Sequence, residues 1–289
     1  MVTYGIMTQA SPTPIRVGGS ALPDGVMMLT PLAAAIARES ADGTLTIESF
    51  PLPPRKSHPV ERLPFIRIVP KLVSQMGLVV RGWKPSRGKR IPLPLLAAII
   101  CIGILSTLAN GVFATLPAVW HAAGSSILQL LLFFSLIGVT RALPRFGRIW
   151  RFHGGEHQAI AAYEAGMPLT VENTRKRTLY HPRCGTNLAM LAMLLMVPGM
   201  VLGSVISGYA GYVITVAVPL PALCIAFEMV MWGQNRLRPL LWPGLLFQRL
   251  TVAMPGLAES RAGIAALEAA LAEHARIERL TSAPAGAAQ

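Results

Sequence analysis

Residues 188–206 read LAMLAMLLMVPGMVLGSVI and contain no charged side chain. An α-helix needs about 20 apolar residues to cross the hydrocarbon core of a bilayer. Three other runs have the same character, and the whole chain is 53% hydrophobic but only 13% charged. We therefore expect a mainly α fold, a four-helix polytopic membrane protein whose spans form two tight hairpins. The other three predicted spans are residues 93–118, 122–140 and 209–232.

The basic residues predict the orientation of these spans. All 26 Lys and Arg residues lie in residues 1–90, 141–186 and 233–289, and the short turns within the two hairpins contain none. The positive-inside rule then places both termini and the middle loop in the cytoplasm. The net charge of +13 could also indicate nucleic-acid binding. The basic residues flank the spans without aromatic interleaving, however, so we expect the lipid bilayer as a partner and no nucleic acid.

The segments around the spans show further organisation. Asp42-Gly43 is a hairpin-turn signal between the strand-like residues 32–39 and 44–50, which predicts a small N-terminal cytoplasmic β element. Apolar positions in residues 259–280 recur at helical spacing, which predicts a C-terminal amphipathic helix. The expected divisions are residues 1–17 (disordered), 18–90 (β-hairpin and an amphipathic region at 60–80), 91–140 (first transmembrane hairpin), 141–187 (cytoplasmic metal-site loop), 188–232 (second transmembrane hairpin) and 233–289 (interfacial segment, helix and tail).

The middle loop carries a cluster of residue types that bind metals. Residues 151–164 read RFHGGEHQAIAAYE, and we expect a helix over residues 149–165. His153 and His157 are four apart, so both imidazoles project from one helix face. Glu156 completes an H-x-x-E-H string, the order in which inverted zincins place two zinc ligands and a general base.

Residues 180–186, YHPRCGT, supply the second half of the predicted site. His181 and Cys184 form an H-x2-C pair before the third span, and Cys with His favours zinc over magnesium or calcium. Glu164 shares the histidine stripe but lies about 10 Å along the helix axis from His157, which excludes it from the same coordination shell. A simpler alternative is that these side chains only satisfy hydrogen bonds near a membrane surface.

Glu228 is the only acidic residue within any predicted span, and we expect no basic residue to share its depth. A carboxylate inside a membrane is costly and marks a functional site by default. The alternative is that it snorkels to the nearby interface or is protonated.

Residues 153–186, HGGEHQAIAAYEAGMPLTVENTRKRTLYHPRCGT, resemble the signature of the bacterial YqhQ-like family, domain of unknown function 1385. The likeness extends to Gly18-Gly19, to DGVMM at 24–28 and to PGL and QRLT between 243 and 251, and covers most of the chain. It implies a predicted metal-dependent protein of the bacterial cytoplasmic (inner) membrane, with undefined reaction and substrate. The implied metal ligands are His153, His157, His181 and Cys184, with Glu156 and Glu164 nearby.

This sequence departs from the family pattern at several polar positions. Ser20, Asp24 and Leu29 stand where the family has Gln, Glu and Arg, and Gln158 and Phe227 stand where Lys and Tyr are usual. The candidate ligands are retained while groups around them have changed.

Two functions of different classes follow. The first is a zinc-dependent, hydrolase-like membrane enzyme with a cytoplasm-facing site, a lipid or membrane-protein substrate and the catalytic candidates Glu156, Glu164 and Glu228. The second is a non-catalytic scaffold or assembly factor with a structural metal. Three protein ligands and an open position favour an enzyme, whereas four ligands favour a structural site. A transporter that uses Glu228 is a weaker third reading, because the spans are too few for paired inverted repeats.

Overall fold

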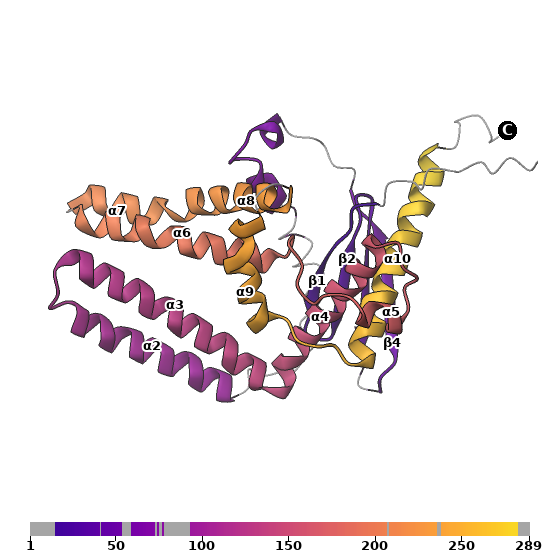
Figure 1. Ribbon diagram of the computed structural model, residues 1–289, viewed down its shortest axis with the longest axis horizontal. Helices are drawn as coiled ribbons and strands as arrows, with labels where there is room; N and C mark the ends of the chain where they lie inside the picture. Colours follow the sequence, from indigo (N-terminus) through magenta and orange to yellow (C-terminus); the bar gives the residue numbers. More distant parts are fainter. Residues whose placement is uncertain are drawn as a thin grey trace, which may run out of the picture.

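The computed structural model describes residues 15–40, 42–53, 59–72, 74, 77, 93–206, 208–235 and 238–282. Long apolar helices form one end of the molecule, and a small sheet with two helices packed on it forms the other (Figure 1). Most of the predicted disordered N-terminus, the basic stretch 84–90 and the end of the C-terminal tail lie outside the described residues.

The N-terminal sheet is a four-stranded antiparallel meander in the order β1-β2-β3-β4. The predicted hairpin is β3 with β4, and Gly43 takes the left-handed conformation of its turn with φ 82°. The sheet is larger than the predicted hairpin. Strand β2 was not predicted because it is a continuous buried run, GVMML, and lacks the alternation of apolar and polar residues that identifies a strand. The strands are β1 (Gly18–Leu22), β2 (Gly25–Leu29), β3 (Ala33–Glu39) and β4 (Leu45–Pro51).

Helices α4 (Pro144–Glu164) and α10 (Leu257–Ser282) cover one face of this sheet (Figure 1). The helix expected over residues 149–165 is confirmed as α4, which begins five residues earlier, at Pro144, and whose second half is largely buried. Helix α10 likewise buries its apolar stripe against the sheet and α4. The shared core comprises Val26, Met28, Ala35 and Ala37 of the sheet, Phe152, Ala159 and Ile160 of α4, and Ala262, Ala266, Leu267 and Ala270 of α10.

Glycines let α4 and α10 approach closely. A Cβ on Gly155 would lie 2.5 Å from the carbonyl oxygen of Glu259, and a Cβ on Gly263 would lie 2.7 Å from the carbonyl oxygen of Gly155. On the same helix, a Cβ on Gly154 would clash with the carbonyl oxygen of Ala253. The two glycines of the HGGEH string are therefore needed for close packing. Gly155 lets α4, which carries the histidines, pack directly against α10.

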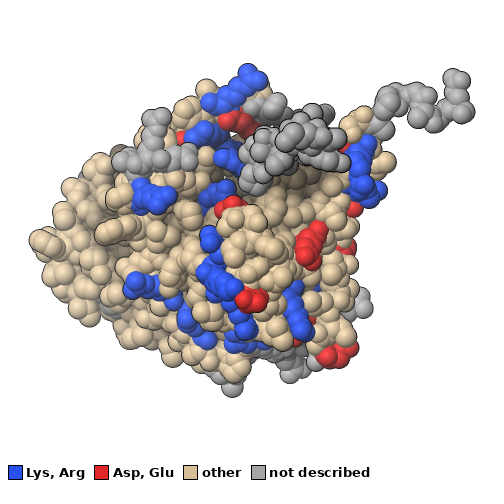
Figure 2. Space-filling model, turned by 45° about the vertical axis from the view of Figure 1, so that its right-hand side comes forward, with Lys and Arg blue, Asp and Glu red and all other residues tan. Residues whose placement is uncertain are grey.

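Within the described residues, three helical stretches are long and apolar enough to cross a membrane: Ala118–Ala142, Gly185–Val205 and Gly208–Gln234. These match three of the four predicted spans. The first predicted span is helical as α2, where the stretch Ile99–Phe113 is apolar but by itself shorter than the other three, so the count of four spans is not matched among the described residues. The end of the molecule that these helices form is nearly free of charged residues in Figure 2, and the charges gather at the other end. The apolar helices are α2 (Leu93–Phe113), α3 (Ala118–Ala142), α6 (Gly185–Val205), α7 (Gly208–Ala217) and α8 (Pro219–Asn235).

The remaining short elements are η1 (Pro59–Arg62), α5 (Val171–Arg175), η2 (Arg238–Leu241) and α9 (Trp242–Thr251). Helix α9 was expected to lie along the membrane interface, and its Trp242 is 70% exposed. Its opposite face is buried, however, and packs on α3 and α6 where these helices meet the sheet end (Figure 1). Helix α9 therefore joins the apolar end of the molecule to the candidate site.

Candidate metal centre

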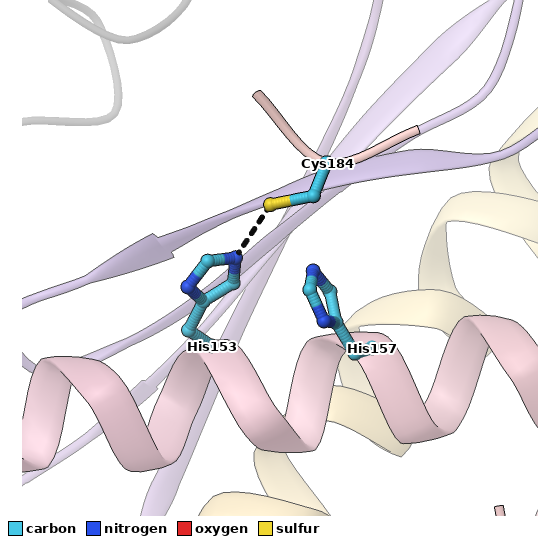
Figure 3. A group of neighbouring side chains, drawn as sticks. All are labelled: His153, His157 and Cys184. Carbon is cyan, nitrogen blue, oxygen red and sulfur yellow. Dashed lines mark hydrogen bonds between the residues drawn. The ribbon is translucent and has the colours of Figure 1, made fainter. Parts of the chain in front are cut away.

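His153, His157 and Cys184 meet at the junction between the sheet end and the apolar helices. The two histidines project from one face of α4, and Cys184, the N-cap residue of α6, points toward them (Figure 3). One ligand atom from each residue lies within 4.8 Å of the other two, and all three side chains are buried. The Nε2 atom of His153 is 3.2 Å from the Sγ atom of Cys184. This nitrogen and sulfur set is the type that zinc prefers.

Hydrogen bonds from the backbone orient both histidines. The Nδ1 atom of His153 lies 2.8 Å from the carbonyl oxygen of Thr251, and Nδ1 of His157 lies 2.5 Å from that of Leu179. A carbonyl only accepts, so Nδ1 carries the proton in each ring and the Nε2 lone pair is left for a metal. Burial, together with repulsion whenever His153 is protonated, lowers the pKa of His157 to about 3. Its ring is therefore neutral, as a ligand must be.

His181 lies beside this group but does not join it. Its ring centroid is 5.7 Å from that of His157, and its two nitrogens have other partners. Nε2 lies 3.4 Å from Glu164 Oε2, and Nδ1 accepts a hydrogen bond from the backbone N–H of Arg183. Glu164 also forms an ion pair with Arg183. The structure thus brings together three of the four predicted ligands and pairs the fourth with Glu164.

Glu156 is buried on the same stretch of α4. Its side chain packs against Gly19 of β1, where a Cβ would lie 2.7 Å from both Cγ and Oε1 of the glutamate. The Oε2 atom has no hydrogen-bond partner among the described residues. Burial raises the pKa of Glu156 to about 8; the charge of His153 opposes this shift and that of Cys184 adds to it. The carboxyl group can therefore hold a proton near neutral pH.

Comparison with known proteins places this arrangement in a family. A family model described as a protein of unknown function (DUF1385) matches residues 63–273. The chain belongs to this family. It is also 26% identical over 283 residues to the uncharacterized protein YqhQ of Bacillus subtilis (strain 168), an alignment that covers 84% of this chain and 88% of the relative. No solved structure gives a significant match. The resemblance noted from the sequence is confirmed, and neither comparison assigns a function.

In this DUF1385 member, Gln248 of α9 holds the turn that carries Cys184. Its side chain accepts from the N–H of His181 at 2.9 Å, donates to the His181 carbonyl at 2.9 Å and donates to Asn187 Oδ1 at 2.8 Å. Asn187 in turn donates to the carbonyl of Pro182 at 2.8 Å. A Cβ on Gly244 would lie 2.5 Å from Asn187 Oδ1, so the glycine permits this contact. These bonds fix the backbone from His181 to the start of α6.

Sequence reasoning did not assign these supporting residues, although the family resemblance touched them. The QRLT segment at 248–251 contributes Gln248 and the Thr251 carbonyl, and Gly19 of the Gly18-Gly19 pair makes room for Glu156. No residue-type pattern identifies a glutamine or a backbone carbonyl as part of a metal site, because neither is a typical zinc ligand.

Glu228 has a basic partner that the span pattern did not predict. Arg67 Nε donates to Oε1 at 2.8 Å and Arg67 Nη2 donates to Oε2 at 2.5 Å, while the backbone N–H of Phe65 donates to Oε1 at 3.0 Å. The expectation that no basic residue shares the depth of Glu228 was therefore wrong. Arg67 comes from the predicted amphipathic region, 161 positions away from Glu228 in the sequence. Glu228 thus anchors that segment on α8, outside the group of His153, His157 and Cys184.

Proposed function

We propose that this chain is an integral protein of the bacterial cytoplasmic membrane with a zinc-dependent, hydrolase-like activity. In this proposal α2, α3, α6 and the α7–α8 stretch form four spans, and both termini face the cytoplasm. The distribution of Lys and Arg supports the orientation. The sheet, α4 and α10 then form a cytoplasmic unit, and the candidate site lies where this unit meets the spans.

The observation that carries the proposal is the three-residue ligand group. His153, His157 and Cys184 offer two nitrogens and one sulfur within 4.8 Å of one another, and both Nδ1 atoms are occupied by carbonyl oxygens. Catalytic zinc sites have three protein ligands, whereas structural sites have four. A zinc ion held by these residues would act as a Lewis acid and make water a better nucleophile near neutral pH.

Glu156 is the residue that would move the proton. Its Oε2 atom is buried and free of hydrogen bonds within the described chain, and its carboxyl group is close enough to His153 and Cys184 to feel their charges. A general base has to lie within hydrogen-bond reach of the proton it takes. Glu164 and Glu228 have positioning roles in this scheme, because they hold His181 and Arg67.

The alternative is a membrane scaffold with a structural metal. One observation favours it: the His181 ring lies close to that of His157, with centroids 5.7 Å apart. A rotation of His181 away from Glu164 would supply a fourth ligand and close the site.

The activity is tested with Glu156→Gln in a strain that lacks the native protein. We expect the variant to bind zinc like the wild type but to fail to restore the function of the strain. Glu172→Gln, an exposed carboxylate on α5, is the matched control and should restore it. Full restoration by Glu156→Gln with zinc bound would exclude Glu156 as the base and favour the scaffold.

A further inference from the structure

A cavity of about 250 Å³ borders the candidate metal centre, and Cys184 forms part of its wall. A second cavity of about 400 Å³ lies next to it, and Arg183 and Gln234 line both. Arg183 directly precedes Cys184 in the chain, so the ligand group and both cavities meet at one turn.

The two cavities are rich in arginine. Arg16 and Arg183 line the first, and Arg177 and Arg183 line the second. The Nε atom of Arg177 is buried without a hydrogen-bond partner among the described residues. Among the described residues that line the two cavities, Glu164 is the only carboxylate. It pairs with Arg183, so the three arginines still leave positive charge in excess.

Several other lining residues of the first cavity are apolar and belong to the predicted spans. Leu188 of α6 and Phe227, Val230 and Met231 of α8 line it. These residues lie in the helical stretches that are long enough to cross a membrane. The cavity therefore joins a cationic side to an apolar side at the end of two spans. The guanidinium group of arginine forms bidentate hydrogen bonds with phosphate, and basic pockets between transmembrane helices bind lipid headgroups.

We propose that this cavity binds the phosphate headgroup of an anionic membrane lipid. Arg16 and Arg183 hold the phosphate, and the start of the acyl chains lies on Leu188, Phe227 and Met231. The inference deepens the proposed function, since it names a phospholipid as the class of substrate presented beside Cys184. The binding itself depends on the arginines and does not require a metal.

The test measures binding of short-chain phosphatidic acid to the purified full chain in detergent, with the metal content of every sample recorded. Dioctanoyl phosphatidic acid should bind, and Arg16→Gln should raise its Kd about tenfold through the loss of a charge-assisted contact. Arg183→Gln should act in the same direction. Arg175→Gln, an exposed arginine of α5 outside both cavities, is the matched control and should leave the Kd unchanged.

Absence of lipid binding would overturn the inference, and so would three further results. These are equal binding by Arg16→Gln and Arg175→Gln, equal binding of dioctanoylglycerol, which lacks the phosphate, and displacement by inorganic phosphate at the same concentration as the lipid. The last result would identify a free phosphate compound as the ligand. Arginine-dependent lipid binding without bound metal would contradict the proposed enzyme but support the lipid site. Bound metal without lipid binding would support the proposed enzyme but contradict the lipid site.

Discussion

The Nε2 atom of His153 lies 3.2 Å from the Sγ atom of Cys184, although the two residues are 31 positions apart in the chain. His153 is on a helix packed against a sheet, and Cys184 begins a helix long enough to cross a membrane. The contact therefore joins the two ends of the molecule. Arg141 supports it from α3 by donating to the carbonyls of Arg249, Leu250 and Val252, next to the Thr251 carbonyl that orients His153.

Gln248→Ala should weaken metal binding although Gln248 is not a ligand. The change removes two hydrogen bonds to the backbone of His181 and one to Asn187 and leaves these buried partners unsatisfied, which costs about 1–3 kcal/mol for each buried group. Loss of such outer support lowers metal affinity by about 10–100-fold. Zinc titration against a competing chelator measures this. Gln129→Ala, which changes an exposed glutamine of α3, should bind zinc like the wild type. Equal zinc affinities for both variants would show that the turn at His181 keeps its conformation without Gln248.

Gly19→Ala should impair function while zinc remains bound. The new Cβ would meet Glu156 at 2.7 Å and push the carboxyl group out of its place. The adjacent Gly18 has nothing within 4 Å of its Cβ position, so Gly18→Ala is a close control. Complementation of the deletion strain together with zinc analysis distinguishes the two. If Gly19→Ala restores function as well as Gly18→Ala does, the position of Glu156 does not matter for the activity.

Glu228→Gln should destabilise the protein through loss of its pair with Arg67. The Glu228 side chain is 2% exposed, but that of Arg67 is 27% exposed, so the loss of this half-buried pair costs less than the roughly 3–5 kcal/mol of a fully buried one. The exposed pair of Glu172 and Lys176 is the comparison, because Glu172→Gln should cost less than about 1 kcal/mol. Thermal unfolding in detergent reports both. A small effect at Glu228 would mean that residues 59–72 are not held on α8 in solution.

Glu259 should contribute to the pH dependence of stability. Burial raises its pKa, but hydrogen bonds and the charges of Arg151 and Arg148 outweigh burial and leave the pKa below the ordinary value of 4.5. Because the folded pKa is the lower one, its stabilising contribution is present above the unfolded pKa and is lost as the pH falls through the folded pKa. Unfolding measured from pH 6 down to about 3 should therefore show a smaller acid destabilisation in Glu259→Gln. An unchanged acid slope would exclude this ion pair as a contributor.

Much of this arrangement could be predicted because its signals are local. Apolar runs identified three helices long enough to cross a membrane, and Asp42-Gly43 identified the β3–β4 hairpin. The four-residue spacing of His153 and His157 predicted a shared helix face, and both do project from one face of α4.

The remainder depends on contacts between distant segments. The partner of Glu228 is 161 positions away at Arg67, and the turn of His181 is held by Gln248 from 67 positions away. His181 stands three residues before Cys184, as a zinc-ligand pair would, yet its nitrogens face Glu164 and the Arg183 N–H. Spacing indicates which residues can meet, whereas hydrogen-bond competition decides which do.

Zinc content of the purified full chain tests the central claim most directly. We expect about one zinc ion per chain in the wild type and its loss in His157→Ala and Cys184→Ser, as three protein ligands require. Cys224→Ser and His274→Ala, which change a buried cysteine and a buried histidine elsewhere, should keep the ion, and so should His181→Ala. A wild-type protein without zinc, or a Cys184→Ser variant that binds zinc as well as Cys224→Ser does, would contradict the account.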